Sequence, residues 1–284
     1  MKKNTEKAYF WPQWFFDSLD KLERQKIPTS LVKALCRANL YLWRALNLYD
    51  DFLDGEGLPK NLPLANNYYR KFLEIYYRLN LSDNFYKIFN RVITDLDNAN
   101  RAEVSAEKLK TKDGRIYYPH RLPTFNNLAL LSRKSLALGL GLVAILDIIS
   151  RKGKHDSKNL PQIKAALSFF RYALAAKQLS DDSCDWLEDL EAGNITPANA
   201  LILKAAKKKH LTLNFQKHPE ILYQLFIDEA SQKISEGIKT LCSQARREGL
   251  KIELTSKSPL IKNLIEPMES SVSRAEAARL SFSK

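Results

Sequence analysis

The residues best suited to chemistry in this sequence lie in two acidic runs. The first run reads Tyr49-Asp50-Asp51-Phe52-Leu53-Asp54-Gly55-Glu56. Asp50 and Asp54 are four residues apart, and Asp51 and Asp54 are three apart. A helix places residues at these spacings on one side. The first run therefore predicts a cluster of three carboxylates at the end of a helix.

The second run begins at Gln178 and contains five acids, Asp181, Asp182, Asp185, Glu188 and Asp189. A helix turns by about 100° per residue, so Asp181, Asp185 and Asp189 fall within an arc of about 80°. Asp182 and Glu188 flank that arc. Apolar residues occupy the other side of the helix: Leu179, Trp186, Leu187 and Leu190.

A solvated helix face is the ordinary explanation for a single acidic run. Three features favour a binding role here. Asp is a poor helix former, so a merely solvated face more often carries Glu and Lys. Neither run has a Lys or Arg four residues after an acid, and the pattern occurs twice. Unpaired carboxylates in a chain with 45 Lys and Arg residues indicate a missing cation. Their oxygen ligands suit a hard divalent ion such as Mg²⁺, which commonly bridges carboxylates to substrate phosphates.

The elements that must position these acids are predicted to be helices. The 284 residues include only 9 Gly and 11 Pro, and Leu, Lys and Ala are the commonest residues, so the predicted fold class is all-α. The first run ends a helix over about 28–55, which Gly55, Gly57 and Pro59 terminate. The second run lies in a helix over about 160–190, which Gly193 and Pro197 end.

The rest of the chain shows the same helical period. Further helices are expected over about 64–79, 82–100, 124–150, 197–208, 219–248 and 258–279. Gly139 and Gly141 are costly inside a helix unless a neighbouring backbone or a ligand comes close. Residues 102–123 predict a surface loop or small hairpin, and 153–159 a polar linker. We find no internal repeat, so we expect one helical domain over 1–284.

Charge and cysteine content bound the function. A net charge of +13 attracts anions, which include nucleic acid, acidic lipid and phosphorylated small molecules. Three widely spaced cysteines form no disulfide or zinc pattern, which suits a reducing cytosol. No signal peptide is recognisable, and the longest apolar run, 135–149, is too short to span a membrane. These features predict a cytoplasmic protein.

The two runs resemble the Asp-rich motifs of class I isoprenoid synthases. The string Asp50-Asp51-Phe52-Leu53-Asp54-Gly55 is similar to their first motif. Squalene and phytoene synthases have a second motif similar to Gln178-x-x-Asp181-x-x-x-Asp185-x-x-Glu188-Asp189-x-x-x-Gly193-x-x-x-Pro197. The string Gln178-x-x-Asp181-Asp182-x-x-Asp185 also resembles the second motif of trans-prenyl diphosphate synthases. The two strings stand in the family's order and at a suitable separation.

The resemblance implies a single helical bundle of the isoprenoid synthase type with a central cavity. It implies an enzyme, a prenyltransferase or terpene synthase, that ionises a prenyl diphosphate with Mg²⁺ and releases diphosphate. The implied metal ligands are Asp50, Asp51, Asp54, Asp181, Asp182, Asp185 and Asp189. Of these, Asp50, Asp51, Asp54, Asp181 and Asp185 are the implied catalytic acids. Gln178 would support the diphosphate. Arg133 and Lys134 are either diphosphate ligands or a surface pair at a helix end.

The chain also departs from the family. It lacks the early Gly-Gly-Lys-Arg stretch and the Arg-Arg pair that elongating synthases carry for their second substrate. It has Leu58-Pro59-Lys60-Asn61 after the first motif instead. The stretch from Lys134 to Gly141 is only partly similar to the central helix of the head-to-head synthases. Prenyl transfer, squalene or phytoene synthase-like coupling, and cyclisation of one prenyl diphosphate therefore stay open.

Two other functions compete with this expectation. The first is a non-catalytic basic helical protein that binds nucleic acid or an anionic surface. The second is a family member that has lost catalysis and serves as a subunit. Residues 102–121 and 204–210 are basic, but they match no recognised nucleic-acid module, so we expect no nucleic acid as partner. Peripheral membrane contact, through an amphiphilic substrate, and a homodimer stay open.

Overall fold

The computed structural model describes residues 5–53, 55–152 and 160–282. These residues are mostly helical, which confirms the all-α prediction. The chain divides into two compact units. Unit 1 comprises 1–104, 133–171 and 245–265, and unit 2 comprises 105–132, 172–244 and 266–284. The expected linker 153–159 and Asp54 lie outside the described residues. One domain over 1–284, with a central cavity, stays a prediction.

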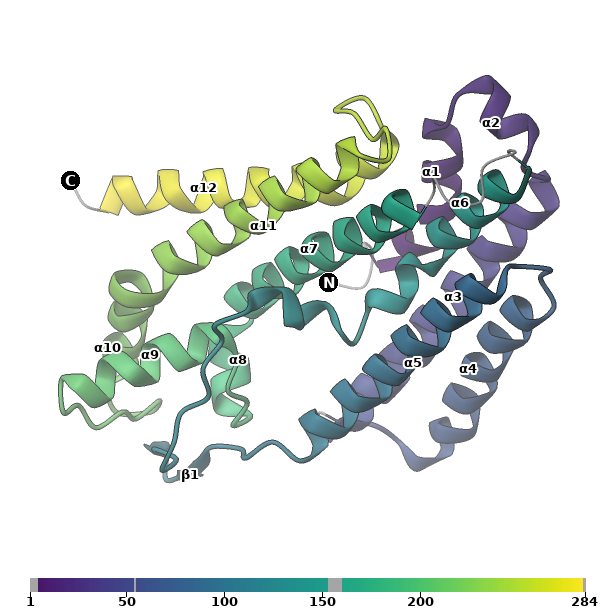
Figure 1. Ribbon diagram of the computed structural model, residues 1–284. Helices are drawn as coiled ribbons and strands as arrows, with labels where there is room; N and C mark the ends of the chain where they lie inside the picture. The colour runs from purple at the N-terminus through teal and green to yellow at the C-terminus, as the bar shows by residue number, and fades with distance from the viewer. Residues whose placement is uncertain (1–4, 54, 153–159, 283–284) are drawn as a thin grey trace. The chain divides into compact units, whose positions relative to one another are not determined.

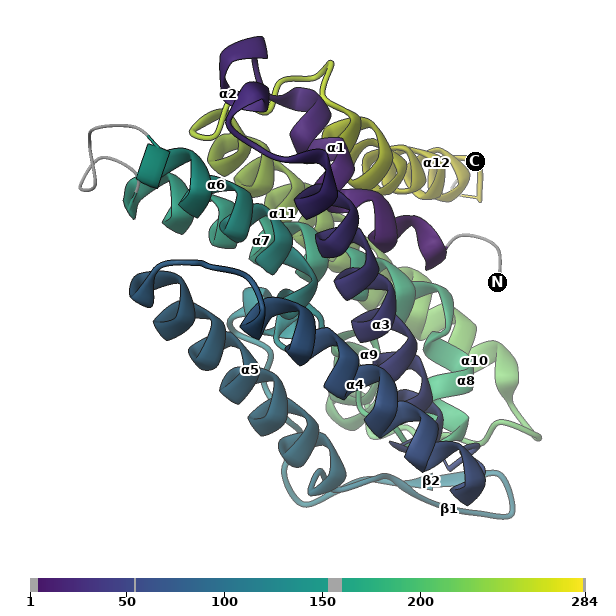
Figure 2. The same ribbon diagram turned by 90° about the vertical axis from the view of Figure 1, so that its right-hand side faces the viewer.

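Unit 1 is built around three successive helices, α3, α4 and α5, which run side by side (Figure 2). Phe72 and Tyr76 of α4 pack against Phe85 and Phe89 of α5, and all four side chains are fully buried. Burial of each such side chain stabilises the fold by about 1.5–3 kcal/mol. The helices of this unit are α1 (Trp11–Ser18), α2 (Lys21–Gln25), α3 (Thr29–Leu53), α4 (Leu62–Tyr77), α5 (Asp83–Val104), α6 (Leu140–Lys152), the first part of α7 (Leu160–Cys184) and the last part of α11 (Gln232–Leu250) (Figure 1).

A buried carboxylate joins two helices of this unit. Asp147 of α6 is 3% exposed and accepts hydrogen bonds from the backbone N–H of Ser82, at 3.0 Å, and from its hydroxyl. The Ser82 hydroxyl oxygen accepts in turn from the N–H of Phe85, which caps the start of α5. Arg151 lies 3.4 Å from Asp147 and balances its charge. The acid inside the apolar run 135–149 is therefore paired rather than free.

Unit 2 combines helices with a small hairpin. Its elements are β1 (Lys110–Lys112), β2 (Arg115–Tyr117), the rest of α7, α8 (Trp186–Glu191), α9 (Pro197–Lys208), α10 (Pro219–Leu225), the first part of α11, and α12 (Glu266–Phe282). Asp113 and Gly114 connect the two antiparallel strands with φ of 51° and 72°. These positive φ values are what a two-residue hairpin turn requires, and Asp-Gly supplies them readily. The hairpin alternative for 102–123 is thus confirmed.

The expected helix over 124–150 is wrong in its first half. Two 3₁₀ segments, Leu128–Ser132 and Leu136–Gly139, precede α6, which begins only at Leu140. A Cβ on Gly139 would lie 2.6 Å from the ring of Phe170, and one on Gly141 would lie 2.8 Å from Pro12. The two glycines therefore let neighbouring side chains approach the backbone. The sequence predicts that a backbone or a ligand approaches these glycines, and side chains approach them instead.

Three other expectations about the helices need correction. Helix 219–248 is divided into α10, a π-helix (Phe226–Ser231) and α11. Helix 258–279 is a π-helix (Ile261–Ile265) followed by α12. The helices α1 and α2 were not expected. None of the described helices is long and apolar enough to cross a membrane.

Candidate functional site

The first acidic run stands at the C-terminal end of α3. The N–H of Glu56 donates to the carbonyl of Asp51 at 2.9 Å, and the N–H of Gly55 donates to that of Phe52 at 3.2 Å. Gly55 has a φ of +80°. This pair of bonds around a left-handed glycine is the Schellman ending of a helix. The glycine that the sequence marks as a stop therefore ends α3 directly after the acids.

Asp50 is half-buried and forms an ion pair with Lys134, whose Nζ lies 2.8 Å from Oδ1. The same ammonium contacts Glu103 of α5 at 2.5 Å. The expectation that this run lacks a paired cation is thus wrong for Asp50. The cation comes from a distant part of the chain, which no spacing within the run could show. Asp51 is exposed, and its carboxylate has no hydrogen-bond or ion-pair partner among the described residues.

Lys134 lies in the turn between the two 3₁₀ segments, with a side chain that is 31% exposed. Burial lowers its pKa, but the carboxylates of Asp50 and Glu103 outweigh burial and raise the pKa above its ordinary value. The ammonium therefore stays charged over the whole physiological range. Its neighbour Arg133 is exposed. Of the two predicted diphosphate ligands, only Lys134 lies beside an acid of the first run.

The second acidic run spans α7 and α8, and the helix deviates between them. Asp185 has φ −101° and ψ 13°, outside the helical range. The backbone bonds from Asp185 to Asp181 and from Asp189 to Asp185 persist at 3.0 and 2.9 Å. The expected single helix 160–190 is therefore two helices, with a local distortion at Asp185. The Asp185 carboxylate has neither a hydrogen bond nor an ion pair with any described residue.

Asp181 is half-buried and paired with Lys177, one turn earlier on α7. The expectation that the run lacks a paired cation is wrong here too. Positions four apart on a helix are neighbours in both directions, so a lysine at i−4 can pair with an acid as well as one at i+4. This contact could have been read from the sequence.

Asp182 is the most buried acid of the run, with a residue exposure of 6%. Gln178 donates a hydrogen bond to its carboxylate at 2.8 Å. The pKa of Asp182 is raised to about 7, chiefly by burial and also by the negative charges of Asp189, Asp181 and Asp185, against the lowering effect of the Gln178 bond. The charges of these three neighbours thus oppose the ionisation of Asp182. Gln178, which the resemblance assigns to the diphosphate, thus forms a hydrogen bond with an acid of the second run.

The run ends at Gly193, which has a φ of +82°. Asn194 and Gly193 donate to the carbonyls of Asp189 and Leu190 at 2.8 and 3.1 Å, a second Schellman ending. The carbonyl of Gly193 accepts from the N–H of Leu109 at 2.8 Å. Asp189 itself is half-buried. The stop glycine therefore both ends α8 and holds the segment that leads into the hairpin.

The acids of unit 2 suit a hard cation by their chemistry. All are carboxylates, no His or Cys is interleaved except Cys184, and their mutual repulsion would fall if a cation bound. Among the described residues, no group of three or more His, Cys, Asp or Glu is arranged to hold a metal ion. Asp50 and Asp51 belong to unit 1, whereas Asp181, Asp182, Asp185 and Asp189 belong to unit 2.

The aromatic residues near the acids are mainly core. Phe169 and Phe170 are fully buried, and the ring of Phe170 stacks on Trp11 at 5.3 Å between centroids. Phe52 and Tyr172 are half-buried. The two phenylalanines of α7 therefore belong to the hydrophobic core of unit 1.

No protein-family model matches this sequence, and no curated protein is significantly similar to it. The likeness to isoprenoid synthases consequently rests on the two Asp-rich strings.

Proposed function

We propose that this chain is a Mg²⁺-dependent class I isoprenoid synthase that ionises a prenyl diphosphate. The observation that carries the proposal is the crowding of four carboxylates on α7 and α8, where burial and the neighbouring negative charges raise the pKa of Asp182 to about 7. Such perturbed acids concentrate at functional sites. The helical fold and the position of both runs at helix ends, each closed by a Schellman glycine, agree with this function.

The residues would divide the work between two chemical tasks. In unit 1, Asp51, whose carboxylate is unpaired, would hold Mg²⁺ with Asp50 and Asp54. In unit 2, Asp185, whose carboxylate is also unpaired, would hold Mg²⁺ with Asp181, Asp182 and Asp189. When bound, the metal supplies the positive charge that stabilises departing diphosphate. Lys134 and Lys177 each lie beside an acid and would donate charge-assisted hydrogen bonds to diphosphate oxygens. The group that the prenyl cation then attacks is either a second prenyl chain or another part of the same chain, and the mass of the product would distinguish the two.

The proposal is tested by turnover. Purified protein would be incubated with Mg²⁺ and prenyl diphosphates of C10 to C20, with and without isopentenyl diphosphate. Released diphosphate and extracted products would be measured. We expect Mg²⁺-dependent release that Asp50→Asn and Asp185→Asn each reduce by a hundredfold or more. Product mass would separate prenyl transfer, coupling and cyclisation.

Asp228→Asn serves as the matched control, because Asp228 is an exposed acid outside both runs. It should retain the rate of the unmodified protein. If no substrate turns over, and diphosphate with Mg²⁺ does not bind, the chain is not such an enzyme.

A second candidate function is binding of a polyanion, and one observation favours it. The hairpin pairs with the segment that follows the lysine-rich end of α9: the N–H of Ile116 donates to the carbonyl of Leu213 at 3.0 Å, and the N–H of Phe215 donates to that of Gly114 at 2.9 Å. Residues 105–121 of the first basic run and the second basic run, 204–210, both belong to unit 2, and these bonds link the segments that contain them. Affinity for nucleic acid that falls steeply with salt, and that Asp185→Asn leaves unchanged, would support this function.

A further inference from the structure

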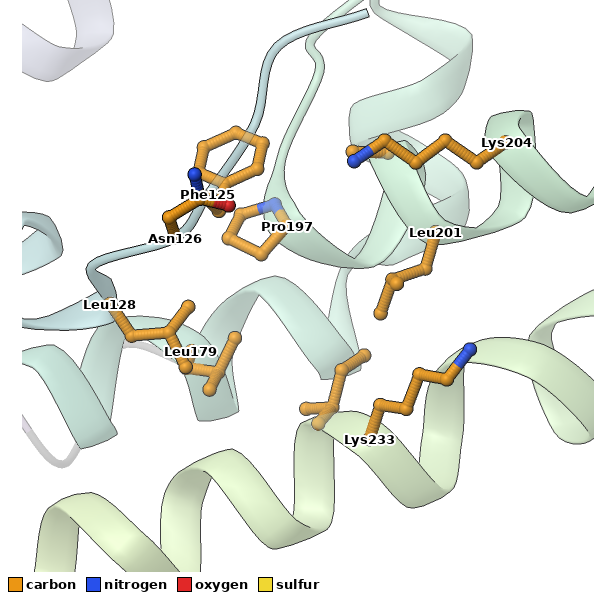
Figure 3. Close-up of a pocket in the computed structure, with 10 residues that line it drawn as sticks. Phe125, Asn126, Leu128, Leu179, Pro197, Leu201, Lys204 and Lys233 are labelled. Carbon is orange, nitrogen blue, oxygen red and sulfur yellow. The ribbon is translucent and has the colours of Figure 1, made fainter.

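Unit 2 contains a cavity of about 270 Å³ with mainly apolar walls (Figure 3). Its walls come from the segment around Leu128, from α7 through Leu179, from α9 through Leu201, and from α11 through Ile234. Leu179 and Ile234 are buried, with exposures of 1% and 3%. One turn beyond Ile234, a Cβ on Gly237 would lie 3.0 Å from Leu128 and 3.1 Å from Leu179. The helices thus pack tightly at Gly237 and leave a hollow beside it.

This cavity is separate from the acidic run of the same helix. Leu179 precedes Asp181 by two residues, which is about 200° around a helix. The side chain that lines the cavity therefore points to the side of α7 nearly opposite the carboxylate of Asp181, whereas that of Asp182, three residues after Leu179, lies within about 60° of it. None of the acids of the second run lines the cavity. The walls of the cavity are therefore made by other residues than the acids of the proposed diphosphate site.

Two lysines line the cavity from facing helices, Lys204 on α9 and Lys233 on α11 (Figure 3). Both are exposed, and neither ammonium pairs with a carboxylate in the part of the chain that the structure describes. Nearby Lys209, in contrast, is paired with Glu229 at 3.0 Å. Pro197, the first residue of α9, also lines the cavity, so the positive end of that helix dipole lies there as well. Two ammonium groups and a helix N-terminus therefore contribute positive charge at the cavity.

We propose that this cavity binds a small amphiphilic anion, with its apolar part among the leucines and its head group between Lys204 and Lys233. At about 30 Å³ for each water-sized group, 270 Å³ holds about nine such groups. That size fits an alkyl or prenyl portion of about five to ten carbon atoms. An ammonium binds a phosphate or a carboxylate by charge-assisted hydrogen bonds. Phosphorylated and carboxylated lipids therefore share the recognised chemistry.

The test measures binding of octyl phosphate and of octanoate by titration calorimetry, in EDTA so that no Mg²⁺ is present. We expect at least one of them to bind. Octanol, which lacks the charge, and inorganic phosphate, which lacks the chain, should each bind at least tenfold more weakly. Lys204→Gln and Lys233→Gln should each weaken binding by about tenfold. The tighter of the two octyl probes identifies the preferred head group.

Lys208→Gln is the matched control, because Lys208 is an exposed lysine of α9 that does not line the cavity. Leu201→Trp should fill the cavity and abolish binding. If that variant does not fold, Lys204→Gln and Lys233→Gln still test whether the cavity binds the probe. Asp185→Asn should leave octyl phosphate binding unchanged, whether or not the protein is an enzyme. Absence of binding at millimolar probe, equal effects of Lys204→Gln and Lys208→Gln, or loss of binding in Asp185→Asn would overturn the proposal.

Discussion

The Nζ atom of Lys134 lies 2.8 Å from the carboxylate of Asp50, and this ion pair joins the turn before α6 to the end of α3. Because Lys134 also contacts Glu103 of α5, one ammonium ties three segments of unit 1 together. Lys134 thus binds the carboxylate of Asp50, which the sequence predicts to be a metal ligand. A cation and this lysine would therefore compete for the same carboxylate.

The stability of this arrangement can be tested with Lys134→Gln. The change leaves Asp50 and Glu103 without their shared cation, so we expect the free energy of unfolding to fall. The side chains are 31–46% exposed, and solvent screening limits the loss to about 0.5–1 kcal/mol. Urea unfolding at low and high salt would measure it, and salt should reduce the difference. Lys87→Gln, at an exposed lysine of α5, is the control. An equal loss in both variants would contradict the expectation.

The burial of Asp182 predicts how stability changes with pH. Its pKa is about 7 in the folded protein, against 3.8 as the ordinary value. Between these values the folded state keeps a proton that the unfolded state has released. Stability should therefore fall as pH rises through this window and level off above about pH 7.

Asp182→Asn removes this titration and keeps an oxygen that can accept from Gln178. We expect the variant to be more stable than the unmodified protein at pH 8, by an amount on the order of 1–3 kcal/mol, and nearly equal to it near pH 4. Unfolding midpoints across this range, without divalent cations, would show it. Asp228→Asn changes an exposed acid and should not alter the pH slope. A slope that Asp182→Asn leaves unchanged would show that Asp182 titrates normally.

The two stop glycines form a matched pair of positions. Both have left-handed φ, +80° at Gly55 and +82° at Gly193. A Cβ at Gly55 would meet nothing within 4 Å, whereas a Cβ at Gly193 would lie 2.9 Å from the carbonyl oxygen of Leu109. Gly55→Ala should therefore cost only the conformational penalty, about 1 kcal/mol. Gly193→Ala should cost at least about 1 kcal/mol more, because the hairpin segment must shift.

Urea unfolding of both variants would separate the two contributions. Equal decreases in the free energy of unfolding would mean that the close approach of Leu109 to Gly193 does not affect stability. Near-UV circular dichroism of Gly193→Ala would report whether the tyrosines of the hairpin region are displaced.

Local sequence signals determined much of the chain's secondary structure. The helices α3, α4, α5 and α9 lie close to their expected ranges, since their apolar residues follow the helical period. Gly55, Gly193 and the Asp113-Gly114 turn act through their own backbone conformations. Glycine and turn preferences depend on the few neighbouring residues, so the sequence alone is sufficient for them. The Lys177–Asp181 pair was equally local and could have been predicted from its spacing.

Only the tertiary structure decided which partners from distant segments the acids have. The Asp50–Lys134–Glu103 pairs, the burial that raises the pKa of Asp182, and the cavity between α7, α9 and α11 each depend on segments far apart in the chain. Two 3₁₀ segments also replace the first half of the expected helix 124–150. Helical period specifies which face of a helix is apolar. It does not specify which neighbour covers that face, and burial and charge pairing follow from that neighbour.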